Sequence, residues 1–233
     1  MKNVAILPAG GSGKRIHSRR PKQYLPVGGV PLLVQTIAVF QRSPLIHEIL
    51  LVVPREDIRR VRSRFVEPYG FSKVSQVLGG GRERQDSVKN GLDAVGDDCD
   101  IVLIHDGVRP FISGSLIRLM IREAAAHGAA TAGVPVKETV KRVDPEGSVL
   151  ETLDRRALWL TQTPQAFRRS VILEAHRTAF RDRFYGTDDA SLVERMGHPV
   201  RMVPATYENI KITTREDLLL AEFLIGARRG KTP

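Results

Sequence analysis

The chain of 233 residues is poor in the residue types that build disulfide and zinc sites. It has one cysteine, Cys99, which excludes an internal disulfide framework and a cysteine-rich zinc site. Its six histidines are scattered, and none is followed by another histidine four positions later, the spacing of paired ligands on a helix. A single domain of this length buries about 70–75% of its unfolded surface, so a core can form without such cross-links.

Long apolar runs are also missing. Pro8 and the glycines after it interrupt the first apolar stretch almost at once, and no later stretch is long enough to span a membrane. We therefore expect neither a signal peptide nor a membrane partner, and we predict a soluble, cytoplasmic protein.

The charge of the chain is strongly positive. A formal net charge of +10 indicates anionic partners, but the basic residues form no long run. On a helix, the local cluster at 59–64 would point in several directions, as a solvated face does. Signatures of RNA binding are missing too. Small polyphosphate molecules are therefore favoured as partners, and we predict no nucleic-acid partner.

Strand-like and helical segments alternate along the chain. Short apolar runs rich in β-branched residues indicate buried strands, and apolar residues at helical spacing indicate helices between them. The predicted strands are 4–7, 48–53, 73–78, 101–104, 129–136, 200–204 and 209–212. The predicted helices are 32–41, 57–66, 86–94, 115–127, 171–180, 188–196 and 218–225. This order predicts one domain over residues 1–233 with an α/β fold, a Rossmann-like three-layer α/β/α arrangement around a mostly parallel sheet.

The alternation breaks at 139–153, where two short strand-like runs flank Asp144-Pro145-Glu146-Gly147. Asp, Pro and Gly stand at the positions that they favour in a type I turn. We predict a β-hairpin arm that projects from the main sheet. An isolated hairpin is marginally stable, so the arm needs a surface to lie on, and the residues alone favour its own domain. Further along, Thr213 and Glu216 have the spacing of a helix capping box.

A glycine-rich, basic stretch at 8–15 follows the first predicted strand. Glycines let backbone N–H groups turn toward an anion and cations neutralise it, so such a loop can hold a phosphate. The spacing excludes two better-known motifs. Arg15 stands where a P-loop needs Ser or Thr, and Ile16 stands where a dinucleotide fingerprint needs a small residue. On these residues alone, a phosphate site and an ordinary surface turn both remain open.

Two later loops also follow predicted strands. The segment 79–87 is a glycine-rich turn into a helix, where the backbone can approach a flat base closely. Asp106 follows the strand at 101–104, and a single carboxylate beside phosphate oxygens suits Mg²⁺. Taken singly, the first is typical of any strand-to-helix turn and the second of a helix cap. In a parallel sheet, however, ligands bind where such loops meet at the carboxyl ends of strands.

Several motifs together resemble one family. The stretch 8–15 followed by Pro21-Lys22-Gln23-Tyr24-Leu25 is similar to the signature of the sugar-phosphate nucleotidyltransferases. Within them, the chain most closely resembles the family of 2-C-methyl-D-erythritol 4-phosphate cytidylyltransferases, over nearly its whole length. The resemblance implies transfer of CMP from CTP to 2-C-methyl-D-erythritol 4-phosphate, which gives 4-CDP-2-C-methyl-D-erythritol and pyrophosphate in non-mevalonate isoprenoid synthesis. It also implies Mg²⁺ as cofactor and a homodimer formed through the arm at about 137–157.

The same resemblance implies roles for individual residues. Arg15 and Lys22 are the predicted catalytic residues, which would stabilise charge on the α-phosphoryl group, and Asp106 is the predicted metal ligand. The predicted nucleotide-binding residues are Pro8, Ala9, Gly10, Gly11, Ser12, Gly13, Gly80, Arg84, Ser87 and Asp106. The predicted residues for the acceptor substrate are Arg109, Thr139, Arg155, Thr163 and Lys211. Arg155 would act either within its own subunit or across the dimer.

Other functions remain as alternatives. A D-ribitol-5-phosphate cytidylyltransferase shares these motifs and differs mainly around the acceptor. A non-catalytic basic α/β module would bind nucleic acid with a steep salt dependence. A dinucleotide-binding oxidoreductase is disfavoured by Ile16. Covalent catalysis is not expected, because Ser12 lacks the flanking glycines of a nucleophile elbow and Cys99 lies among aspartates that disfavour a thiolate.

Overall fold

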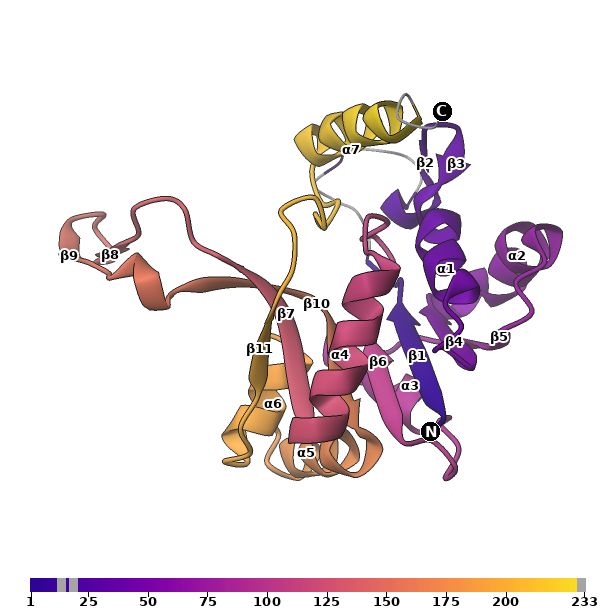
Figure 1. The fold of residues 1–233 in the computed structure, drawn as a ribbon, viewed down its shortest axis with the longest axis horizontal. Coiled ribbons are helices and arrows are strands. Elements are labelled where there is room, and N and C mark those ends of the chain that lie inside the picture. The colour runs from indigo at the N-terminus through magenta and orange to yellow at the C-terminus, as the bar shows by residue number, and fades with distance from the viewer. Residues whose placement is uncertain (12–15, 17–20, 230–233) are drawn as a thin grey trace.

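The structure is a computed structural model, and it describes residues 1–11, 16 and 21–229. In this part of the chain, seven strands form one sheet in the order β11-β7-β10-β6-β1-β4-β5 (Figure 1). Neighbouring strands are parallel except where β10 pairs with β6 and β7. The strands are β1 (Asn3–Pro8), β4 (Glu48–Val53), β5 (Val74–Gly79), β6 (Ile101–Ile104), β7 (Ala129–Pro135), β10 (Trp159–Arg168) and β11 (Arg201–Pro204). The predicted α/β fold with a mostly parallel sheet is confirmed.

Helices cover both faces of the sheet. The first face carries α1 (Leu32–Arg42) and α4 (Gly114–His127), and the second carries α3 (Arg84–Leu92), α5 (Arg169–Arg181) and α6 (Asp189–Arg195). Because both faces are covered, a central strand is apolar along most of its length. In β1, Ala5 and Leu7 join the core on the first face, and Val4 and Ile6 join the core on the second. No described helix is long and apolar enough to cross a membrane.

Two helical regions lie at the margins of the sheet. The predicted helix at 57–66 is helical but irregular, because α2 (Ile58–Val61) is flanked by a 3₁₀ turn (Arg55–Asp57) and a π turn (Arg62–Val66). At the other margin, α7 (Arg215–Arg229) packs near the short hairpin of β2 (Pro26–Val27) and β3 (Val30–Pro31), over a small third core.

β10 lies inside the sheet, and the sequence analysis did not predict it. The stretch 161–165 is polar and contains Pro164, so its composition is that of a loop. Pairing with β7 shifts register between Gln162 and Gln165, and proline is tolerated in a strand at such an irregularity. Polar side chains here bond across the sheet, as when buried Gln165 donates to Thr131 Oγ1 at 2.9 Å.

The segment 209–212 is not a strand, so that prediction is wrong. Asn209 is buried, and its side chain donates to the Thr163 carbonyl at 2.8 Å. The Asn209 carbonyl accepts a bond from Arg109 Nη1 at 2.8 Å. Bonds to side chains therefore take the place of a strand ladder here.

The helix cap ahead of α7 lies one residue later than predicted. Thr214 N donates to Asp217 Oδ2 at 2.8 Å, and Asp217 N donates to Thr214 Oγ1 at 3.3 Å. The reciprocal pair is thus Thr214 with Asp217, in place of Thr213 with Glu216, because α7 begins at Arg215.

The predicted hairpin arm consists of β8 (Lys141–Val143) and β9 (Val149–Thr152), and it projects away from the main sheet (Figure 1). Gly147 N donates to the Asp144 carbonyl at 3.1 Å and closes the turn. The arm does not fold back over its own domain, so that interpretation is wrong. Several apolar side chains on it stay open to solvent: Val143 is 50% exposed, Val149 59% and Leu150 53%.

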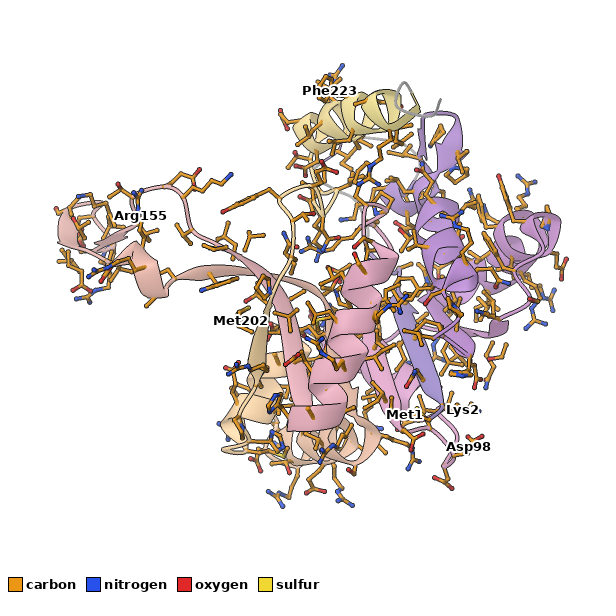
Figure 2. The ribbon with its side chains drawn as sticks, viewed as in Figure 1. Met1, Lys2, Asp98, Arg155, Met202 and Phe223 are labelled. Atoms are coloured by element: carbon orange, nitrogen blue, oxygen red, sulfur yellow. The ribbon has the colours of Figure 1, made fainter. Side chains whose placement is uncertain are left out.

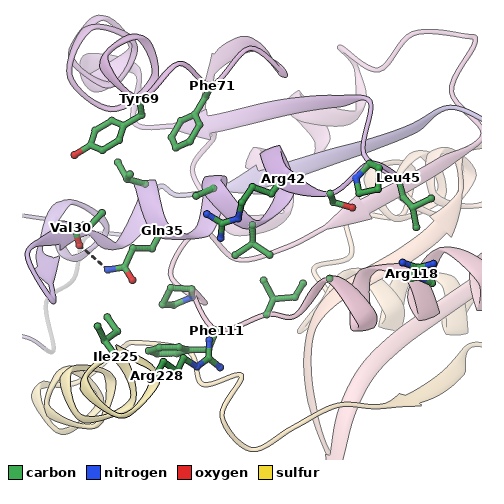
Figure 3. Close-up of a pocket in the computed structure, with 18 residues that line it drawn as sticks. Val30, Gln35, Arg42, Leu45, Tyr69, Phe71, Phe111, Arg118, Ile225 and Arg228 are labelled. Atoms are coloured by element: carbon green, nitrogen blue, oxygen red, sulfur yellow. Dashed lines mark hydrogen bonds between the residues drawn. The ribbon is translucent and has the colours of Figure 1, made fainter. Parts of the chain in front are cut away.

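A hollow of about 760 Å³ lies between α1, the start of α4 and α7, and we call it the apolar hollow (Figure 3). The residues that line it include Phe71, Phe111 and Ile112, all of which are buried. Three arginines also line it: Arg42, Arg118 and Arg228. Arg228 lies over the Phe111 ring, 5.0 Å from its centroid, and pairs with Glu208 at 2.8 Å.

Candidate active site

A second hollow, of about 840 Å³, lies at the carboxyl ends of β1, β5 and β6, and we call it the strand-end pocket. Loops from all three strands line it, within the ranges 8–11, 80–87 and 106–108. Backbone bonds tie these loops to neighbouring strands. Ala9 N donates to the Val52 carbonyl at 2.7 Å, and Gly107 N donates to the Pro8 carbonyl at 2.9 Å. The predicted meeting of the three loops is confirmed.

The loop after β1 forms one wall of the strand-end pocket. Pro8, Ala9, Gly10 and Gly11 line it, whereas the predicted site residues Ser12, Gly13 and Arg15 lie outside the described residues. Lys22 lines the pocket from a short 3₁₀ helix (Lys22–Tyr24), and its side chain is nearly buried. A Cβ built on Gly11 would lie 3.4 Å from Lys22 Cε, so the lysine side chain lies against the glycine loop.

Asp106 is the centre of the charged groups in the strand-end pocket. Its carboxylate lies 3.3 Å from Arg84 Nε, 3.4 Å from Arg109 Nε and 3.0 Å from Lys211 Nζ. Burial alone would raise the pKa of Asp106, but Lys211, Arg84 and Arg109 outweigh it and hold the pKa well below the ordinary value. The carboxylate is therefore ionised, and three cations surround it.

Arg84 connects Asp106 with a second buried carboxylate. Its Nη1 donates to Asp189 Oδ2 at 2.7 Å, and the side chain of Asp189 is only 1% exposed. Burial alone would lower the pKa of Arg84, but Asp189 and Asp106 raise it well above the ordinary value. Behind Asp189, His176 Nε2 lies 3.1 Å from Oδ1. The sequence analysis missed Asp189, because the pair Asp188-Asp189 is typical of a helix start.

Ser87 shapes the loop that follows β5. Its hydroxyl accepts from Gly81 N at 3.1 Å and donates to the Glu83 carbonyl at 3.1 Å. A Cβ built on Gly80 would lie 3.0 Å from Ser87 Oγ, so this position has little room for a side chain. Gly80 and Ser87, two of the residues predicted to bind the nucleotide, both line the strand-end pocket.

Arg109 and Thr163 support Asp106 from behind and do not line the pocket. Thr163 Oγ1 accepts from Asp106 N at 3.1 Å and also lies 3.1 Å from His105 Nδ1. His105 is fully buried, and this burial lowers its pKa to about 4. A neutral histidine and a threonine thus fix the end of β6. The sequence analysis missed the role of His105, because a lone histidine has no motif.

Arg155 lies on the exposed arm, away from the main body of the chain (Figure 2). Thr139 is exposed too, and neither residue lines the strand-end pocket of the same chain. Arg155 Nη1 donates to the Lys137 carbonyl within the arm. Lys211, by contrast, lines the pocket, and Ile212 N donates to the Val108 carbonyl at 3.0 Å beside it. One chain therefore brings Lys211 to the site but leaves Thr139 and Arg155 outside it.

The arrangement suits an anionic ligand and electrostatic stabilisation by charged groups that are already held in position. No group of three or more His, Cys, Asp or Glu side chains that could hold a metal occurs among the described residues. A single carboxylate with substrate phosphates is nevertheless the usual setting for Mg²⁺, and Asp106 offers it. Cys99 is buried and its pKa is raised to about 11, so the expectation that it is not a nucleophile is supported.

A pocket with basic residues at the carboxyl ends of parallel strands is typical of nucleotide-binding α/β proteins. Comparison with known proteins narrows this class. Residues 3–227 match the family described as "IspD: 2-C-methyl-D-erythritol 4-phosphate cytidylyltransferase". A protein of that name from Syntrophus aciditrophicus is 52% identical over 99% of this chain and 98% of its own. The chain belongs to this family of cytidylyltransferases, enzymes of the non-mevalonate isoprenoid pathway.

Two further comparisons agree with this assignment. A cytidylyltransferase of the same name from Geobacter metallireducens is 49% identical over 95% of this chain and 96% of its own. The crystal structure of 4-diphosphocytidyl-2C-methyl-D-erythritol synthase from Anaerococcus prevotii superposes with a TM-score of 0.86 at 32% identity, covering 97% of this chain and 96% of that one. The resemblance seen in the sequence is confirmed, and the alternative of a non-catalytic module is wrong, because the family is one of enzymes.

Proposed function

We propose that the strand-end pocket is where this chain transfers CMP from CTP to 2-C-methyl-D-erythritol 4-phosphate. The observation that carries the proposal is the coincidence of family and site. The family match spans 3–227, and four of the residues predicted from the family's motifs, Lys22, Arg84, Asp106 and Lys211, line one pocket. The D-ribitol-5-phosphate alternative has no support among the relatives named above.

The reaction needs electrostatic help more than a strong base. A phosphate oxygen of the acceptor attacks the α-phosphorus of CTP, a new P–O bond forms, and the bond to the bridging oxygen breaks. Pyrophosphate leaves with that electron pair. Because the acceptor phosphate is already anionic near neutral pH, the barrier lies in bringing two anions together and in stabilising charge on the α-phosphoryl oxygens. We assign that stabilisation to Lys22 and Arg15.

The two substrates would occupy different sides of the strand-end pocket. We assign the triphosphate to the loop at 8–13 and the cytosine and ribose to Gly80, Arg84 and Ser87. Lys211 then faces the phosphate of the acceptor. Arg109 and Thr163 act through Asp106, because their polar atoms are bonded to Asp106 and to Asn209.

Mg²⁺ is the cofactor that we propose, with Asp106 as its protein ligand. The donor set fits, since Asp106 is ionised and offers carboxylate oxygens beside the place assigned to the triphosphate. Lys211 and Arg109 both contact Oδ2 of Asp106, whereas Oδ1 has only the contact with Arg84 at 3.3 Å, which is longer than the usual 2.7–2.9 Å of charge-assisted bonds, so Oδ1 is the less tightly held oxygen. When bound, the ion would neutralise triphosphate charge and orient the leaving group.

We propose that the active protein is a homodimer in which the arm reaches the neighbouring subunit. The arm projects from the sheet and exposes Val143, Val149 and Leu150. An isolated two-stranded hairpin is marginally stable, so such an arm gains most by packing on another chain. In that arrangement Thr139 and Arg155 would bind the acceptor phosphate of the partner subunit's pocket.

The test is pyrophosphate release from CTP with Mg²⁺, with 2-C-methyl-D-erythritol 4-phosphate and D-ribitol 5-phosphate offered in parallel. We expect release with the first acceptor only, and we expect a chelator to abolish it. Release with ribitol phosphate alone would contradict the assignment of 2-C-methyl-D-erythritol 4-phosphate as the acceptor but would leave the assignment of the pocket unchanged. Release that continues after full chelation would contradict the proposal that Mg²⁺ is the cofactor.

A further inference from the structure

Arg84 is shared between the strand-end pocket and a buried layer behind it. Its side chain lines the pocket and is 30% exposed, yet its guanidinium contacts two carboxylates on opposite sides. The bond to Asp189 is 2.7 Å, whereas the contact with Asp106 is 3.3 Å. The third nitrogen, Nη2, is buried and has no hydrogen-bond partner in the described structure. The two contacts, from Nε and Nη1, together hold the plane of the guanidinium, and the bond to Asp189 is the shorter of the two.

Asp189 is itself anchored from two other elements. His176 of α5 holds its Oδ1 at 3.1 Å, with the imidazole N–H donating. Gln165 of β10 accepts the backbone N–H of Asp189 at 3.0 Å, and the same side chain donates to Asp188 at 2.6 Å. The carboxylate is 1% exposed, and Arg84 and His176 outweigh burial to keep its pKa low. Such a held carboxylate has no freedom to follow a moving arginine.

A free arginine side chain is long and flexible, and ordering it costs rotamer entropy. A site that uses a guanidinium gains when this cost is met before the ligand arrives. The contact across 105 positions of sequence between Arg84 and Asp189 supplies this preorganisation. Asp189 also limits the pairing of Arg84 with Asp106, because without Asp189 the guanidinium would be free to pair wholly with Asp106.

We propose that Asp189, held by His176, is a positioning residue that fixes Arg84 for nucleotide binding in the strand-end pocket. The inference rests on the proposed function, because it takes CTP as the ligand. Asp189 contacts no ligand itself in this scheme. It acts through the guanidinium alone, so its contribution must vanish when Arg84 is absent.

A double-mutant cycle tests this dependence. Asp189→Asn, Arg84→Ala and the double variant are compared by the dissociation constant of CTP and by kcat and KM separately. We expect Asp189→Asn to weaken CTP binding about tenfold, because the Arg84 side chain must then be ordered when CTP binds. In the Arg84→Ala background the same change should alter CTP binding by less than about twofold. Additive effects, or normal CTP binding in Asp189→Asn, would overturn the proposal.

Two controls separate positioning from damage to the fold. Asp182→Asn removes another carboxylate, one that pairs with Arg195 at 3.2 Å on the surface, and it should leave CTP binding unchanged. Thermal unfolding of each variant shows whether the native state is retained. If Asp189→Asn does not fold, the cycle is repeated with His176→Leu, which removes the support of Asp189 and leaves the pair with Arg84. A loss of CTP binding that persists in the Arg84→Ala background would again overturn the proposal.

The test also distinguishes failure of the proposed function from failure of the role of Asp189. If the protein bound no CTP in any form, the proposed function would fail and the cycle would show no binding at the start. If the parent protein binds CTP and only the cycle is additive, the function stands and the role of Asp189 falls.

Discussion

Two hollows of similar size teach different lessons about this molecule. The apolar hollow measures about 760 Å³ and the strand-end pocket about 840 Å³. Both contain arginines. In the apolar hollow Arg42 and Arg118 are exposed, whereas in the strand-end pocket Lys22 is buried and Arg84 is held between two buried carboxylates. Volume and charge sign do not separate the two places.

What separates them is how the charged groups are held. A solvated arginine on a helix face keeps its rotamer freedom and its hydration, so a ligand gains little from it. A cation fixed in a partly dry pocket acts on developing charge without having to reorganise. The strand-end pocket, with loops tied together by backbone bonds, is built in the second way. The predictions below test this contrast, from the largest expected effect to the smallest.

Lys22→Ala should have the largest effect. Removal of one preorganised cation from the reacting phosphoryl group typically costs on the order of 10²–10³ in rate. We expect kcat to fall by that amount while the dissociation constant of CTP changes far less, since the other groups of the pocket still bind the triphosphate. Steady-state kinetics with an independent CTP titration would show the split. Near-normal turnover would remove Lys22 from the chemistry.

Arg155→Ala should lower activity about 10- to 100-fold, the range for loss of one charge-assisted phosphate contact. Mixed dimers then show where Arg155 acts. If it acts across the dimer, a mixed dimer of Arg155→Ala and Lys22→Ala chains contains one intact site, and an equal mixture recovers about a quarter of the parent activity. If it acts within its own chain, each site keeps one defect and nothing is recovered.

His105→Gln should change the pH dependence of stability. The pKa of His105 is about 4 in the fold against an ordinary 6.5, so the unfolded chain takes up the proton first as pH falls. Its contribution to stability is therefore complete above 6.5 and is lost as pH falls from 6.5 toward 4, by up to about 3 kcal/mol. Glutamine does not titrate. Urea unfolding across this range should show a shallower decline for the variant, and an equal decline in both proteins would contradict the assignment.

Arg42→Ser and Arg118→Ser in the apolar hollow should have the smallest effect. Surface substitutions of this kind usually change stability by less than about 0.5 kcal/mol, and these arginines line no part of the strand-end pocket. We expect turnover and CTP binding equal to those of the parent protein. A drop in turnover without a drop in thermal stability would contradict the contrast between the two hollows and indicate that the apolar hollow is a functional site.

The sequence predicts the parts of the fold that depend on local pattern. Nearly continuous apolar runs predict β4 and β6 to the residue, because strands covered on both faces have few polar positions. β10 escapes prediction because its polar side chains bond across the sheet, so neither alternation nor apolarity marks it. Long-range context, absent from a sequence window, decides such a strand.

The candidate site also contains some features that the sequence predicts and others that it does not. Glycine-rich loops after strands are visible in the sequence, and the position of Asp106 at a strand end follows from them. The partners that hold these groups are not visible, since Asp189 meets Arg84 across 105 positions and Thr163 meets His105 across 58. A motif names the residues that touch a ligand more readily than the residues that keep them in place.

The arm has a consequence for how the chain tolerates insertions. β7 ends at Pro135 and β10 begins at Trp159, and these two residues are paired, so the arm is the long end of one hairpin. Added or deleted residues at the tip, near Gly147, leave the pairing at the root unchanged. One residue added between Trp159 and Thr163 would reverse the sides on which Thr163 and Gln165 lie. Length is therefore free at the tip of the arm and fixed at its root.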